Sequence, residues 1–120
     1  MWSKIDKRQK EQAFANLVRA YRKQYVGKGP EKIEVDFKGN WAIAFMTGAL
    51  SKVENFYLRD ERNEEMVRHA RTQEVKNLYD EMNTDEMEKL VGANYVKLFT
   101  DVDFTDDEVV SIFVFDKSIE

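Results

Sequence analysis

The chain has 120 residues, of which 42% are hydrophobic and 35% charged, with a formal net charge of −4. This length is about that of one domain, and its hydrophobic fraction suffices for one core. The negative charge argues against a nucleic-acid-binding surface, and the absence of cysteine excludes disulfides, thiolate metal sites and cysteine nucleophiles.

No segment of the sequence predicts membrane insertion. The basic N-terminus is not followed by an apolar run, as a secretory signal would be. The longest apolar run, Trp41–Met46, is far shorter than the ~20 residues that span a bilayer. We therefore expect a soluble, cytoplasmic protein with one domain at residues 1–120, in which residues 1–10 form a frayed N-terminal segment.

Apolar residues spaced like one face of a helix predict a helix from about Ile5 to Tyr25. This face comprises Phe14, Leu17, Val18, Tyr21 and Tyr25, with Lys, Arg and Gln on the other face. Gly27 or Gly29 is expected to take the positive φ that ends the helix, and Pro30 prevents its continuation. These three residues should form the turn into the first strand.

An alternating pattern predicts a β-hairpin after this turn. Ile33, Val35 and Phe37 alternate with charged residues, as in a half-buried strand. Gly39-Asn40 favours a two-residue turn, and the second strand is expected from Trp41 to about Ala49.

A capping box predicts a short helix after the hairpin. Ser51 can accept a backbone N–H of the first helical turn, and Glu54 can bond back to the backbone of Ser51. A second long helix is expected from about Asn63 to Val91, with a kink near Asn83.

A second hairpin is expected after Gly92, which should end the long helix. Its strands are predicted at Tyr95–Phe104 and Glu108–Phe115. The element order therefore predicts an α+β fold, α-ββ-αα-ββ. In this fold an antiparallel four-stranded sheet from two hairpins packs against two long helices and one short helix.

The second face of the sheet is expected to be partly apolar. The residues assigned to it are Trp41, Phe45, Phe113 and Phe115. An exposed apolar patch of this kind is typical of a partner or dimer interface.

No arrangement of residues in the sequence indicates catalysis. His69 is the only histidine, and its position in the middle of a predicted helix favours a solvated side chain. The densest acidic cluster comprises Asp101, Asp103, Asp106, Asp107 and Glu108. It lacks the glycine and glutamate spacing of a calcium loop, so a solvated turn is expected. We predict no enzyme activity, no catalytic residue, no cofactor and no metal.

The segment YVGKGPEKIEVDFKGNWAIAFMTGALSKVE, from Tyr25 to Glu54, resembles the opening half of the MpsC-like family. That family consists of small proteins associated with a sodium-translocating, membrane-potential-generating system. The later segments EEMVRHARTQ and LVGANYVKLFTDVD resemble its second helix and last hairpin. The resemblance covers about residues 10–116.

The resemblance implies an accessory role, and it carries over no catalytic residue. Among the matched positions, Gly27, Gly29 and Pro30 are expected to form the turn, and Ser51 with Glu54 to cap the short helix. Arg71 is the candidate for a buried ion pair or a partner contact, because its planar guanidinium offers five donors.

Two functions are therefore compared below. The first is a non-catalytic accessory or regulatory protein of a membrane ion or inorganic-carbon transport system. It would be a homodimer that acts by protein–protein contact, with a membrane transporter subunit as partner. The alternative is a small-ligand or anion-binding sensor module with a pocket near Arg71 and Tyr25.

Overall fold

The computed structural model of the chain describes residues 6–81 and 84–120. Its elements are α1 (Lys7–Tyr25), β1 (Lys32–Lys38), β2 (Trp41–Thr47), α2 (Lys52–Tyr57), the 3-10 helix η2 (Glu61–Asn63), α3 (Glu64–Glu81), α4 (Asp85–Val91), β3 (Tyr95–Asp103) and β4 (Glu108–Phe115). The predicted α+β fold with the order α-ββ-αα-ββ is confirmed.

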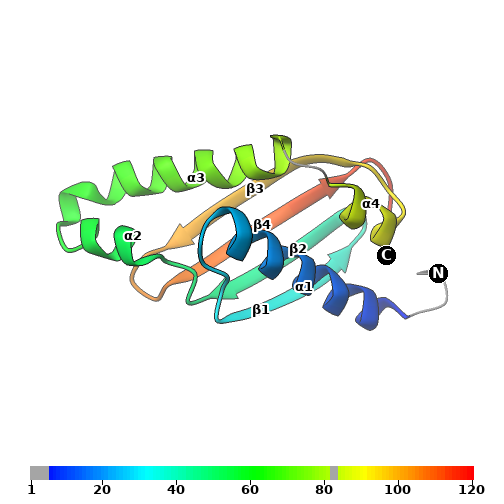
Figure 1. The fold of residues 1–120 in the computed structure, drawn as a ribbon. Helices are drawn as coiled ribbons and strands as arrows, with labels where there is room; N and C mark the ends of the chain where they lie inside the picture. Colours follow the sequence, from blue (N-terminus) through cyan, green and yellow to red (C-terminus); the bar gives the residue numbers. More distant parts are fainter. Residues whose placement is uncertain (1–5, 82–83) are drawn as a thin grey trace.

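The four strands form one antiparallel sheet in the order β1-β2-β4-β3. In Figure 1, α1 runs along the β1 side and α3 along the β3 side, and both cover the same face of the sheet. Among the described residues, no helix or strand covers the opposite face of the sheet. Short α2 and the start of α3 extend beyond the end of the sheet. We call this projecting end, from α2 to the first turn of α3, the helical tip.

The start of the chain is described from Asp6. Its carboxylate accepts the backbone N–H of Gln9, and the Gln9 side chain bonds back, which makes a capping box at the start of α1. Residues 1–5 of the predicted N-terminal segment lie outside the described residues.

The single helix predicted from Asn63 to Val91 is two helices in the structure. Before α4, Thr84 has φ −94° and ψ 14°, outside the helical conformation, and makes no side-chain cap. The change of direction lets α4 pack against α1, and it buries Met87, Leu90 and Val91. The predicted kink residue, Asn83, lies outside the described residues.

The core lies between the helices and one face of the sheet. Phe14 of α1 makes edge-to-face contacts with Phe37, Phe113 and Phe115, with ring centroids 5.7, 5.2 and 6.2 Å apart. The prediction that Phe113 and Phe115 lie on the open face is therefore wrong, because both are buried in this core. Tyr25, predicted on the apolar face of the first helix, is 54% exposed.

Helix side chains occupy both edges of the sheet. The buried carboxylate of Glu11 in α1 accepts the backbone N–H of Phe37 in β1 at 2.7 Å. At the opposite edge, Arg68 of α3 donates to the carbonyl of Val102 in β3 at 2.6 Å and also pairs with Asp101. The N–H of Phe37 and the carbonyl of Val102 are thus occupied and cannot pair with a further strand added at these edges.

Candidate functional site

A cavity of about 520 Å³ opens at the helical tip, between α2, α3 and the end of α1. We call it the tip pocket. Its apolar lining comes from Val26, Val53, Tyr57, Met66, Val67 and Ala70. Its polar lining includes Ser51, Glu54, Arg71 and Glu74. The volume is within the range of small-molecule sites, and apolar walls with a few charged groups are typical of them.

The turn after α1 brings the end of that helix to the pocket. Gly27 has φ +93°, a conformation that a side chain would strain. A Cβ at Gly29 would lie only 3.2 Å from the carbonyl oxygen of Arg19, so the turn must pass close to α1. Lys28 then donates from Nζ to the carbonyl of Leu50 at 3.0 Å, and Pro30 is buried. The turn is thereby tied to the segment that leads into α2.

The start of α2 is capped as a reciprocal box. The Ser51 hydroxyl accepts the N–H of Glu54 at 3.2 Å, and the Glu54 carboxylate accepts the N–H of Ser51 at 2.9 Å. None of the six residues of α2 is buried, so this helix has little core packing of its own. The cap is therefore the main local support of α2.

Arg71 and Glu54 form an ion pair in the wall of the tip pocket. Arg71 Nη1 donates to both carboxylate oxygens of Glu54, at 2.7 and 2.8 Å. The side chains are 5% and 18% exposed. Burial alone would raise the pKa of Glu54, but the hydrogen bonds from Arg71 and Ser51 outweigh it and hold that pKa below its usual value. One carboxylate thus serves both the helix cap and the buried arginine.

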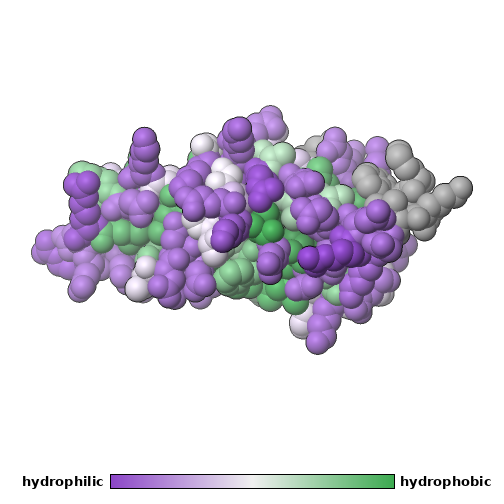
Figure 2. All heavy atoms as spheres, turned by 90° about the horizontal axis from the view of Figure 1, so that it is seen from below, coloured by the Kyte–Doolittle hydropathy of each residue, from purple (hydrophilic) through white to green (hydrophobic). Residues whose placement is uncertain are grey.

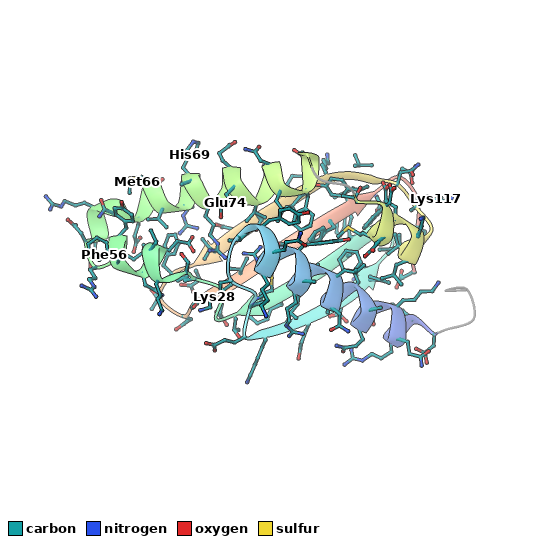
Figure 3. All side chains as sticks on the ribbon, in the orientation of Figure 1. Lys28, Phe56, Met66, His69, Glu74 and Lys117 are labelled. Atoms are coloured by element: carbon teal, nitrogen blue, oxygen red, sulfur yellow. The ribbon has the colours of Figure 1, made fainter. Side chains whose placement is uncertain are left out.

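A second arginine is buried behind this pair. Arg22 of α1 is 1% exposed, and its Nε and Nη2 have no hydrogen-bond partner among the described residues. The same holds for the buried hydroxyl of Tyr79 in α3. Burial lowers the pKa of Arg22, and so does the positive charge of Arg71, whereas Glu54 and Glu74 oppose this shift. Figure 3 shows Glu74 projecting from the side of α3 that faces α1.

Sequence reasoning missed Arg22 as a site residue. It placed the Lys and Arg residues of α1 on a solvated face, yet the buried stripe of α1 comprises Glu11, Phe14, Ala15, Val18 and Arg22. The available signal was spacing, because Arg22 follows Val18 by four positions and Val18 follows Phe14 by four. Tyr25, predicted near the pocket, does not line it; the next residue, Val26, does.

The uncovered face of the sheet carries a central apolar stripe. It comprises Trp41, Ile43, Phe45, Phe99, Val110 and Ile112, with Ile43, Ile112 and Phe99 paired side by side across β2, β4 and β3. We call these six residues the open sheet face. Four of them, Trp41, Phe45, Phe99 and Val110, are 38% to 52% exposed. The edge strands flank the stripe with charges of both signs, such as Lys38 and Glu34.

The helical tip is the second exposed apolar surface. Val53, Phe56, Tyr57 and Met66 are 44% to 65% exposed. Figure 2 shows hydrophobic surface at the end of the molecule where Figure 1 places α2, surrounded by hydrophilic residues. The Phe56 and Tyr57 rings contact each other edge to face, with centroids 5.7 Å apart.

The acidic turn between β3 and β4 is only partly solvated. Asp107 has φ +51°, and its carboxylate accepts the backbone N–H groups of Ala49 and Leu50 at 2.9 and 3.1 Å. It therefore fixes the segment before α2, a role that the sequence prediction missed. The carboxylates of Asp103, Asp106 and Glu108 lie within 4.8 Å of one another on the surface. Exposed acidic groups of this kind do not by themselves make a metal site.

The remaining sequence candidate is the histidine of α3. His69 is exposed, and in Figure 3 it points from α3 away from the sheet. Among residues 6–81 and 84–120, no helix is both long and apolar enough to cross a bilayer.

Comparison with known proteins gives the family. The family described as "Na+-translocating membrane potential-generating system (MpsC)" matches residues 6–117. A relative from Bacillus subtilis (strain 168), described as "Uncharacterized protein YrhF", is 40% identical over 107 residues, which cover 89% of this chain and 88% of that protein. The comparison with solved structures found no match. Because the family match spans nearly the whole chain, the protein belongs to the MpsC family.

Proposed function

We propose that the chain is a non-catalytic, cytoplasmic accessory component of a sodium-translocating, membrane-potential-generating system, and that it acts by protein–protein contact. The family description supports the association with such a system. Its two apolar surfaces support action by contact, because apolar patches of this kind usually mark interaction sites.

The helical tip is the observation that carries the proposal. Three of the tip's exposed apolar residues, Val53, Phe56 and Tyr57, lie on α2, which has no buried residue, so their exposure does not follow from packing the core. Phe56 and Tyr57 are the aromatic types that anchor interfaces, and Arg59 lies over the Phe56 ring at 5.4 Å. We assign the contact with a membrane transport subunit to this surface.

A second copy of the chain is the proposed occupant of the open sheet face. Four strands and seven paired positions span roughly 19 × 24 Å from ordinary strand spacings. The flat area of such a face is about 460 Å², and the relief of its side chains adds to it, which places the contact at the small end of specific interfaces. Its apolar centre and its rim of both charges match the usual anatomy of an interface.

The test uses one variant for each surface. The tagged chain is used to isolate partners from detergent-solubilised membranes of its host, and its mass in solution is measured by light scattering. We expect the wild type to be dimeric and to recover a polytopic ion-transport protein. Phe56→Glu should lose the membrane protein and stay dimeric, whereas Phe45→Glu should become monomeric.

Two results would overturn this assignment. Equal recovery of the transport protein by Phe56→Glu and wild type would remove the tip as the contact. Recovery of no membrane protein by the wild type, together with a normal membrane potential in cells lacking the gene, would reject the accessory function itself.

A further inference from the structure

The residues on the uncovered side of the sheet form a grid that the strand register fixes. Each row of the grid crosses the strands in the order β1-β2-β4-β3 and joins residues that are paired side by side. From the turn between β1 and β2 toward the helical tip, the rows are Lys38, Trp41, Val114 and Lys97; Asp36, Ile43, Ile112 and Phe99; Glu34, Phe45, Val110 and Asp101; and Lys32, Thr47, Glu108 and Asp103. In the first three rows the two central positions are apolar, and every edge position except Phe99 is charged.

The charges of this grid are separated along the strands. The first row carries positive charges at both edges, on Lys38 and Lys97, and no negative charge. In the third row, Glu34 and Asp101 place negative charges at the same two edges. All four residues are exposed. Asp101 bonds to Arg68 and to the backbone through one oxygen, Oδ1. The face is therefore positive at one end and negative toward the other.

Two twofold arrangements of a face-to-face pair keep the strands aligned, and they differ in the charges that meet. An axis parallel to the strands places β1 over β3 of the second copy. Lys38 then faces the partner's Lys97, and Glu34 faces the partner's Asp101, so like charges meet. An axis that crosses the strands at the second row reverses the strand direction instead. Lys38 then faces the partner's Glu34, and Lys97 faces the partner's Asp101, so opposite charges meet.

The apolar residues of the face fit the arrangement with the crossing axis. Ile43, Ile112 and Phe99 lie on the axis, so each of them meets its own copy. On one side of the axis, Trp41 faces the partner's Phe45. The fourth row, which is mostly charged, has no opposing row and faces solvent. Apolar contacts thus fill the centre of the interface, and complementary charges lie at its rim.

We propose that two copies pack antiparallel across the open sheet face, with the twofold axis at the second row, and that the pair joins two membrane transport subunits. The fourth row lies at the end of β2, and α2 follows beyond the sheet (Figure 1). Because the axis reverses the strands, the two helical tips lie at opposite ends of the pair, and each tip binds one transport subunit. This inference rests on the function proposed above, which supplies the dimer and the tip contact.

Charge exchange at the β1 edge tests the orientation. Neither Lys38 nor Glu34 makes an ion pair within the described part of the chain. At low ionic strength, Lys38→Glu alone and Glu34→Lys alone should each weaken dimerisation roughly tenfold or more, because each creates two contacts between like charges. An equimolar mixture of the two variants should dimerise like the wild type, because both contacts then regain opposite charges. Lys32→Glu, on the same strand outside the contact, is the matched control and should leave the dimer unchanged. Sedimentation equilibrium measures all four samples.

Cross-linking provides a second test, which the absence of cysteine makes specific. Asp36 lies on the axis row, so Asp36→Cys should be joined to its own copy, ~10 Å away across the interface, by a short thiol cross-linker. Lys32 lies four residues along the same strand, so its two copies are ~27 Å apart and Lys32→Cys should not be joined. An axis parallel to the strands would separate both residues from their copies by the same distance, and the two variants would then cross-link equally.

The outcomes separate this inference from the function on which it rests. The orientation is wrong if the wild type is dimeric but Lys38→Glu dimerises as tightly, if mixing the two charge variants restores nothing, or if both cysteine variants cross-link equally. These results would leave the dimer and the tip contact in place. A monomeric wild type would reject the dimer itself. The native mass of the complex isolated from membranes should contain two chains and two transport subunits, and a single transport subunit for each pair would overturn the joining role.

Discussion

Replacing Glu54 by glutamine tests the carboxylate that both caps α2 and pairs with buried Arg71. Glutamine can still make the reciprocal cap with Ser51, so Glu54→Gln removes the charge and spares most of the cap. Arg71 is then buried without a counter-charge, and the described residues offer buried Arg22 no ion pair either. Breaking a buried pair costs about 3–5 kcal/mol, and the lower end applies because Glu54 remains 18% exposed.

We therefore expect Glu54→Gln to lose about 3 kcal/mol of unfolding free energy. In a domain of this size that corresponds to a fall in Tm of roughly 10 °C. Arg71→Met should cost less, about 1–2 kcal/mol, because the remaining carboxylate reaches solvent and still caps α2. The double variant should cost about as much as Arg71→Met alone, because Glu54→Gln has nothing further to unpair.

Urea unfolding followed by far-UV circular dichroism measures all three variants. Lys7→Gln, which removes the partner of Glu120 at an exposed ion pair, is the control and should leave the unfolding free energy nearly unchanged. A loss below about 1 kcal/mol for Glu54→Gln, or strictly additive losses in the double variant, would refute the reasoning.

The pH dependence of the same variant has a definite sign. The native pKa of Glu54 is lowered, so its stabilisation is present above the unfolded pKa and is lost as pH falls through the native pKa. The stability difference between wild type and Glu54→Gln should therefore shrink below about pH 4. A difference that stays constant down to acid unfolding would contradict the ion-pair account.

Three further predictions concern the turns. Gly27→Ala should cost about 1–2 kcal/mol in urea unfolding, because φ is +93° although the space is open; an unchanged midpoint would contradict this. Asp107→Ala should lose about 2 kcal/mol, because the two amides lose their acceptor, and Asp107→Asn clearly less, because its neutral oxygen still accepts; equal losses would contradict this account. The backbone N–H of Asn94, followed by its side chain, holds the pKa of Asp116 below its ordinary value. This stabilisation is lost as pH falls through the native pKa, so Asp116→Asn should flatten part of the fall in stability below about pH 4.

Local patterns in the sequence predicted the elements well. The capping box at Ser51, the Gly39-Asn40 turn and the helix end at Gly92 each depend on neighbouring residues, and all three appear in the structure. The break before α4 was predicted only as a kink. The reason is that a change of direction at Thr84 depends on the packing of α4 against α1, which lies far away in sequence.

The face assignment of β4 failed for a related reason. Almost every residue of β4 is apolar, so an alternating pattern cannot show which residues face the core. The one serine of the strand, Ser111, lies on the buried face. There Ser111 bonds with Thr100 of β3 at 2.9 Å, which removes the usual cost of burying a hydroxyl. Only the register with β2 and β3 shows that Phe113 and Phe115 face the core.

The candidate site was predictable only in part. Arg71 and Glu54 were identified separately, from a family resemblance and from a cap, and their pairing required the tertiary structure. Arg22 and Asp107 were missed because charged residues are assigned to solvent by default. Their burial or pairing depends on residues far away in the sequence, such as Ala49 and Leu50, whose backbone N–H groups bond to Asp107.

The occupied edges of the sheet have a consequence for how far association can proceed. A free edge can recruit strand after strand, and such growth has no natural end. Here Glu11 and Arg68 each occupy one backbone group of an edge strand, which hinders that route. A face-to-face contact between two copies instead uses the same surface of both. A pair formed in this way has no second open sheet face to offer, so association through the sheet should stop at two chains.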